Sequence, residues 1–160
     1  SEEVWIRDGV RVNPCKHHAK PEGWIWEQSL ERCLVSPSGV LVKKTLLKKY
    51  GMFNETLPVC EDYDLWLKIS RDNPVGLEPS LSVMKYGGHD DQLSRKYPAM
   101  NRFRVSALMD ALEREDHPEF LKKIIDVLEK KLTILIKGYE KREKREEAEE
   151  CRAMLNSLGG

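Results

Sequence analysis

The sequence predicts an α/β domain followed by an α-helical tail. In the first part, short β-rich segments alternate with helical patterns, and Gly, Pro, Asn and Asp residues separate them. After Pro98, apolar residues recur only at helical spacing. We therefore place a boundary at this proline. Residues 1–97 form the α/β part, and residues 98–160 form a tail that is predicted to pack as a helical hairpin.

The chain opens with a pattern typical of a β-hairpin. Residues 4–12 read as two short strands on either side of Asp8-Gly9, a pair that favours a tight turn. Residues 13–23 have no period and are expected to form a loop. Apolar aromatics return at residues 24–26, and residues 28–33 are long enough for one helical turn.

The middle of the α/β part mixes both patterns. Residues 34–42 are β-rich but contain Pro and Gly, which predicts an edge or bulged strand. Residues 43–50 predict a helix that Gly51 ends. Residues 61–70 predict a second helix, because carboxylates fill its first turn and one face is apolar. That apolar face consists of Leu65, Trp66 and Ile69.

Pro74 ends this second helix, and residues 75–86 predict a strand pair or an extended segment. A polar loop that begins with glycines follows up to residue 95. The tail then shows a helix that stops near residues 116–118 and a second one over residues 120–137. A charged stretch at residues 140–147 precedes a last helical pattern.

Composition narrows the class of function. Lys and Arg number 27 and Asp and Glu also number 27, so no global field recruits nucleic acid or an anionic membrane. No apolar run approaches the roughly 20 residues of a membrane-spanning helix. The four cysteines show no C-x-x-C pair and no disulfide framework. We therefore expect a cytoplasmic protein, free or peripheral at the inner face of the membrane.

Four motifs in a fixed order carry a family resemblance. They are Ser-Pro-Ser-Gly-Val-Leu-Val-Lys-Lys at 36–44, Leu-Lys-Lys-Tyr-Gly-Met-Phe-Asn-Glu at 47–55, Glu-Asp-Tyr-Asp-Leu-Trp-Leu-Lys at 61–68 and Tyr-Gly-Gly-His-Asp-Asp-Gln-Leu-Ser-Arg at 86–95. Together they resemble family-2 glycosyltransferases of the GT-A fold. The resemblance runs from about Trp24 to Arg95, with weaker likeness back to Trp5. It implies the C-terminal part of a nucleotide-diphospho-sugar transferase fold, with a mixed sheet and flanking helices.

The resemblance also implies partners that this chain does not supply itself. In the family, a first half binds the nucleotide-sugar donor and ends in an Asp-x-Asp that holds a divalent metal, Mg or Mn. Asp62-Tyr63-Asp64 matches the Asp-x-Asp pattern, but it begins a helix and does not end an apolar strand. We therefore expect the true metal motif upstream of Ser1. The missing N-terminal half would complete the enzyme, and a glycan or lipid-linked hydroxyl would be the acceptor. This chain alone is expected to be inactive.

Asp62 is the residue we expect to act as general base. An inverting transfer needs a group that takes the proton from the acceptor hydroxyl, and the resemblance places this base at the Asp of Glu61-Asp62. Glu61 is a candidate for orienting the acceptor or Asp62. Asp64 is a candidate for anchoring the helix end to a neighbouring loop, and for binding the substrate. The structural alternative makes Asp62 a helix cap and the other two acids a solvated first turn.

The glycine-led loop carries further candidates. The resemblance makes His89 a metal ligand or a phosphate contact, and Ser94 and Arg95 contacts to the donor diphosphate, since a guanidinium fork suits phosphate oxygens. The alternative is that His89 is solvated and Arg95 lies in a surface salt bridge.

Two tryptophans are candidates for stacking on an acceptor sugar. Trp24 and Trp26 would share one side of a strand, although core packing is the expected fate of at least one. Cys15, His17, His18 and Cys33 have the atoms to bind zinc, but their spacing matches no common zinc motif.

A non-catalytic module is the alternative to a transferase fragment. In that case a small α+β domain with a helical tail binds a partner protein, or a second copy in a homodimer. Reading the coding region upstream of Ser1 for a strand-ending Asp-x-Asp distinguishes the two hypotheses.

Overall fold

The computed structural model describes residues 1–7, 9–12, 19–87, 96–97 and 99–159. The chain divides into two compact units, Ser1–Pro98 and Ala99–Gly160. The first unit contains, in order, β1 (Glu2–Arg7), β2 (Val10–Val12), α1 (Trp26–Glu31), the 3₁₀ turn η2 (Pro37–Gly39), α2 (Lys44–Lys49), α3 (Glu61–Asp72) and β3 (Leu81–Gly87). The second contains α5 (Asn101–Arg114), α6 (Pro118–Glu140) and α7 (Arg145–Ser157). This mixed α/β unit followed by helices confirms the predicted fold class.

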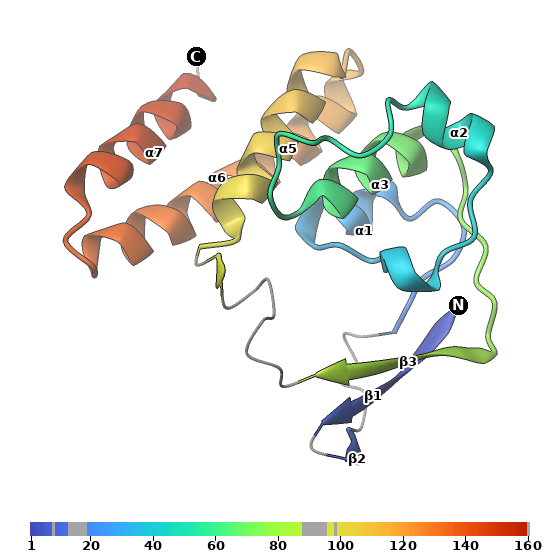
Figure 1. Cartoon of the computed structure of the whole chain (residues 1–160). Helices are drawn as coiled ribbons and strands as arrows, with labels where there is room; N and C mark the ends of the chain where they lie inside the picture. The colour runs from blue at the N-terminus through green and yellow to red at the C-terminus, as the bar shows by residue number, and fades with distance from the viewer. Residues whose placement is uncertain (8, 13–18, 88–95, 98, 160) are drawn as a thin grey trace. The chain divides into compact units, whose positions relative to one another are not determined.

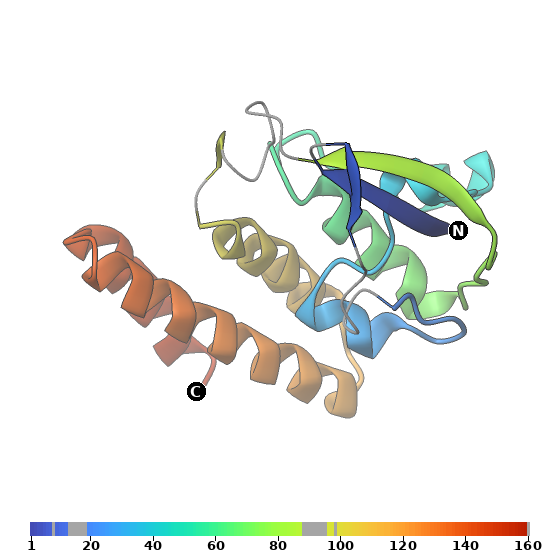
Figure 2. The same ribbon diagram turned by 90° about the horizontal axis from the view of Figure 1, so that it is seen from below.

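A three-stranded mixed sheet with the order β2-β1-β3 forms one layer of the first unit (Figure 1). β1 and β2 pair antiparallel, with Trp5 opposite Val12, which confirms the predicted hairpin. β3 joins the other edge of β1 in parallel, with Trp5 opposite Lys85. A parallel pair needs a long connection, and here this connection contains α1, α2 and α3. Figure 1 shows these three helices on one side of the sheet, and Figure 2 shows the same unit from below, with the sheet overlapping them.

α3 is the central helix of the first unit. Leu65, Trp66 and Ile69, the predicted apolar face, are buried together. Their neighbours are half-buried residues from the preceding loops and α2, namely Cys33, Val35, Val40, Val42, Leu46, Leu47 and Tyr50. Phe53 adds an edge-on ring contact to Trp66, with the ring centroids 6.2 Å apart. This packing fixes α3 against the segment that precedes α2.

Two local predictions were wrong, and a third was resolved between its two alternatives. Residues 34–42 contain the 3₁₀ turn η2 and no strand, because Pro37 has no N–H to donate and Val40 packs against the α3 cluster. Trp24 and Trp26 do not share a strand, because Trp26 begins α1. Of the two alternatives for residues 75–86, the structure has the extended segment, because Val75 forms only an isolated bridge with Gly23 and β3 is the one strand that follows in this described range.

The second unit packs α6 against both α5 and α7. Its core side chains are fully buried and repeat at helical spacing along α6, as Ile124, Leu128 and Leu132. α7 contributes Ala148 and Cys151 to the buried set. None of the helices in the described part of the chain has the length and apolar character required to cross a bilayer.

Candidate functional site: a cavity between the sheet and the start of α3

A cavity of about 520 Å³ lies in the first unit between the sheet and the segment that follows α1. Its lining comprises Glu2, Glu3, Val4, Trp5, Arg11, Val12, Ala19, Lys20, Leu81 and Lys85 from the sheet side, residues 32–37 from the segment after α1, and Asp62 from α3. This volume lies within the range of small-molecule sites in proteins. Of the three acids proposed at the start of α3, Asp62 alone belongs to this lining.

The backbone at the start of α3 fixes where Asp62 points. Cys60 precedes the helix with φ of 65°, a left-handed conformation that is uncommon outside glycine and turns the chain sharply into the helix. Asp62 is the second residue of α3, and its Oδ1 accepts a hydrogen bond from the N–H of Tyr63 at 2.7 Å. The positive end of the helix dipole favours a carboxylate here. The Asp62 carboxylate therefore lies at the N-terminal end of the helix dipole, in the lining of the cavity.

Contacts to α1 and its following segment hold this helix start in place. The buried hydroxyl of Tyr63 donates to the Leu30 carbonyl at 2.6 Å and joins α3 to α1. The Cys33 thiol lies 3.5 Å from Asp62 Oδ2 and 3.3 Å from the Val35 carbonyl. Within the described residues, no Lys, Arg or His lies within ion-pair distance of Asp62. In the described part of the chain, its carboxylate is thus oriented without a cationic partner.

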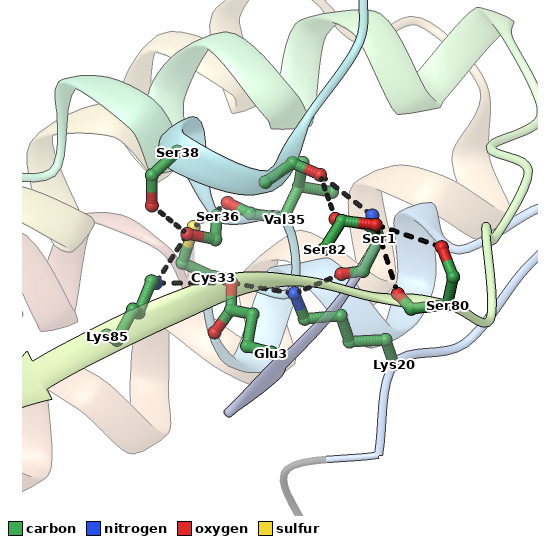
Figure 3. A network of polar contacts seen from close by, with 11 residues as sticks. Ser1, Glu3, Lys20, Cys33, Val35, Ser36, Ser38, Ser80, Ser82 and Lys85 are labelled. Carbon is green, nitrogen blue, oxygen red and sulfur yellow. Dashed lines mark hydrogen bonds and ion pairs between the residues drawn. The ribbon is translucent and has the colours of Figure 1, made fainter. Parts of the chain in front are cut away.

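A network of charged groups ties the cavity walls together (Figure 3). Glu3 accepts from Lys20 at 2.7 Å and forms an ion pair with Lys85 at 3.2 Å. Lys85 also donates to Ser36 Oγ at 2.5 Å. Burial raises the pKa of the Glu3 carboxyl, but hydrogen bonds from Lys20 and Lys85 and the Lys85 charge outweigh it, so this pKa lies below its ordinary value of 4.5. The network connects β1, β3 and the segment after α1.

The other acids proposed at α3 take different positions. Glu61 is half-buried at the first helical position and is not part of the cavity lining. Asp64 is 1% exposed, and its Oδ2 pairs with Lys68 one helical turn later at 2.5 Å. Its Oδ1 has no hydrogen-bond partner among the described residues. Asp62 and Asp64 thus lie in different environments, one at the cavity and one in the core.

The tryptophans proposed for sugar stacking also separate. Trp26, the first residue of α1, is buried in the core with 6% exposure, whereas Trp24 is 67% exposed. Neither belongs to the lining of the cavity. The cavity lining instead contains Trp5, which was not among the site residues predicted from the sequence.

His89, Ser94 and Arg95 lie outside the described residues, as do Cys15, His17 and His18. In the described ranges, no group of three or more His, Cys, Asp or Glu side chains is placed to hold a metal ion. Asp62 and Asp64 do not form a metal pair, because Asp64 is buried and bound to Lys68. The residues described here therefore do not fit the Mg or Mn site that the family resemblance implies.

Sequence reasoning missed Trp5, Lys20, Arg32 and Lys85, which line the cavity with Asp62. Trp5 and Lys85 are neighbours because β1 and β3 pair in parallel, although α1, α2 and α3 separate the two strands in the sequence. One weak indication existed in the sequence: Lys85 is a charged residue inside a β-rich segment, and it is opposite in charge to Glu3. Nothing local specified that the two segments pair.

Comparison with curated proteins relates this chain to glycosyltransferases over part of its length. Uncharacterized glycosyltransferases of Rickettsia felis and Rickettsia conorii are each 37% identical to it over 67 residues, 42% of this chain and 11% of the relative. An uncharacterized glycosyltransferase of Rickettsia bellii is 27% identical over 113 residues, 66% of this chain and 16% of the relative. The chain thus spans only a small share of these relatives. No family model matches it, and no solved structure matches it.

Proposed function

We propose that this chain is the acceptor-side part of an inverting glycosyltransferase in which Asp62 is the general base. The position of Asp62 carries the proposal: its carboxylate is oriented at a cavity and is not paired with a cation among the described residues. The partial similarity to glycosyltransferases supports the class of reaction. The family resemblance of Glu61-Asp62 supports the role of the residue.

In this mechanism the acceptor hydroxyl binds in the cavity with its proton directed at Asp62. Oδ1 accepts the short hydrogen bond from the Tyr63 N–H, whereas Oδ2 accepts only the longer one from the Cys33 thiol, so we assign the proton transfer to Oδ2. The acceptor oxygen then attacks the anomeric carbon, and the bond from that carbon to the nucleoside diphosphate breaks. The leaving group departs with the bonding electrons, and the sugar is transferred with inversion. A positioned base of this kind contributes about 10²- to 10⁴-fold to the rate.

The donor side of the reaction is assigned to a nucleotide-binding half outside this chain. That half would bind the nucleotide-sugar and the Mg or Mn ion, which would stabilise charge on the departing diphosphate. The residues of this chain orient the acceptor and remove its proton. Their contribution can be tested without assigning any contact to the donor.

Asp62→Asn tests the proposal in a protein that joins this chain to its donor-binding half. We expect transfer to fall by about 10²- to 10⁴-fold while donor binding, measured by calorimetry, stays unchanged. Glu55→Gln is the matched control, because Glu55 is an exposed acid outside the cavity lining. Near-normal turnover in Asp62→Asn would remove this residue from the mechanism.

A further inference from the structure

We infer that Trp5 is the platform on which a pyranose ring of the acceptor stacks. The inference rests on the proposed function and deepens it by naming the class of ligand and the residue that binds it. Trp5 is 40% exposed and lines the cavity that also contains Asp62. An indole that is partly exposed inside a cavity offers apolar surface to a ligand, unlike one buried in the core.

The sheet holds Trp5 rigidly. β1 is the central strand, so the Trp5 position is paired with Val12 on one side and with Lys85 on the other. Cross-strand partners project from the same face of a sheet, and Val12, Trp5 and Lys85 all line the cavity. A platform on a central strand loses little conformational entropy when a ligand binds, because the backbone is already fixed.

Lys85 fixes the orientation of the indole ring. Its Nζ lies 5.1 Å from the ring centroid, within the range of a cation–π interaction. Lys85 is itself held by Glu3 and by Ser36. The ammonium therefore occupies one face of the ring, and a ligand would stack on the surface of Trp5 that stays exposed.

The surrounding groups select a sugar over a purely apolar ligand. A pyranose presents C–H groups on one face, which suit an aromatic surface, and hydroxyls at its rim, which need hydrogen-bond partners. Arg32 and Asp62 lie in the same lining and can supply a donor and an acceptor. The other tryptophans of the first unit lack this combination, since Trp26 and Trp66 are buried and Trp24 is not part of the lining.

Indole NMR on this chain tests the inference directly. The four tryptophans give four side-chain N–H resonances, which single Trp→Phe substitutions assign. The probes are the methyl β-glycosides of glucose, galactose and N-acetylglucosamine. We expect at least one of them to shift the Trp5 resonance while those of Trp26 and Trp66 stay in place. A Trp5 resonance that stays unmoved with all three, or a shift confined to Trp24, would overturn the inference.

Two substitutions separate stacking from simple packing. Trp5→Leu keeps apolar bulk but removes the aromatic face and should weaken glycoside binding about tenfold, whereas Trp5→Phe should weaken it about threefold or less. Tyr86→Leu is the matched control, because Tyr86 is an exposed aromatic on the opposite face of the same sheet. Equal losses in Trp5→Leu and Trp5→Phe would contradict stacking. If Trp5→Leu does not fold, the titration of the unaltered chain decides.

Failure of this inference is distinguishable from failure of the proposed function. If Asp62→Asn leaves transfer intact while the Trp5 resonance responds to glycoside, the base is wrongly assigned and the sugar platform stands. If Asp62→Asn abolishes transfer while Trp5 does not respond, the platform alone is wrong.

Discussion

The Cys33 thiol lies 3.5 Å from Oδ2 of Asp62, at the point where the segment after α1 meets the start of α3. A thiol has one proton, and Cys33 has a second acceptor in the Val35 carbonyl at 3.3 Å. A charged carboxylate is the stronger acceptor of the two. The thiol is therefore placed to orient the carboxylate at the cavity.

Substitution of Cys33 should alter turnover in the proposed reaction without removing it. Cys33→Ala deletes a hydrogen bond of about 0.5–1.5 kcal/mol, which predicts a roughly two- to tenfold lower kcat with little change in acceptor KM. Cys33→Ser retains a donor at this position and should recover most of the rate. Steady-state kinetics of both variants check this. Equal rates for Ala and Ser would show that the contact has no orienting role.

Stability should depend on pH through Glu3. The pKa of Glu3 in the folded protein is lower than its ordinary value of 4.5, so the folded state binds the proton less tightly than the unfolded state. The resulting stabilisation is present above pH 4.5 and is lost as pH falls through the lower, folded pKa. Glu3→Gln should lower the free energy of unfolding at pH 7 by about 1 kcal/mol, because its lysine partners remain partly solvated.

Urea denaturation of the two proteins at a series of pH values measures this difference. The gap between them should close as the pH drops well below 4.5, where Glu3 is protonated in both states. A gap that stays constant over this range would assign the effect of Glu3→Gln to packing instead of charge.

Gly51 should be intolerant of a side chain for conformational reasons alone. Its φ is +83°, and a Cβ built there meets nothing within 4 Å. Gly51→Ala should therefore lower the free energy of unfolding by about 1–2 kcal/mol through backbone strain. Gly76 has the same open surroundings without a positive φ, so Gly76→Ala should be neutral or stabilising by up to about 1 kcal/mol. Thermal unfolding compares them, and equal midpoints would refute the explanation.

The helical unit should depend on the buried face of α6. Leu128 is 0% exposed, so Leu128→Ala removes packed apolar volume and should destabilise this unit by about 2–5 kcal/mol. Ile134 lies on the same helix but is 58% exposed, and Ile134→Ala should change stability by no more than about 0.5 kcal/mol. Chemical denaturation followed by circular dichroism measures both. A comparable loss in the two variants would show that the face of α6 with Ile134 is packed as well, contrary to its exposure in the structure.

Local patterns predicted most of the individual elements. The hairpin at residues 4–12 and the helices α2, α3, α5, α6 and α7 follow from residue preferences and from periods of 2 and 3.6, which the chain specifies within a few neighbours. The predicted strand at residues 34–42 failed because its valines pack against α3 instead of pairing in the sheet. The same local patterns identified Glu61-Asp62 as the start of a helix.

The sequence by itself determined which residues form helices and hairpin strands and where acids gather at the start of α3. Only the tertiary structure decided that Asp62 lines a cavity while Asp64 is buried beside Lys68, two residues further along the same helix. It also decided that Trp5 and Lys85 are neighbours, because β1 and β3 pair in parallel although most of the first unit's sequence lies between them. The reason is that helix and turn preferences act between adjacent residues. The pairing of distant strands and the burial of one helix face depend on contacts between segments that are far apart in the sequence.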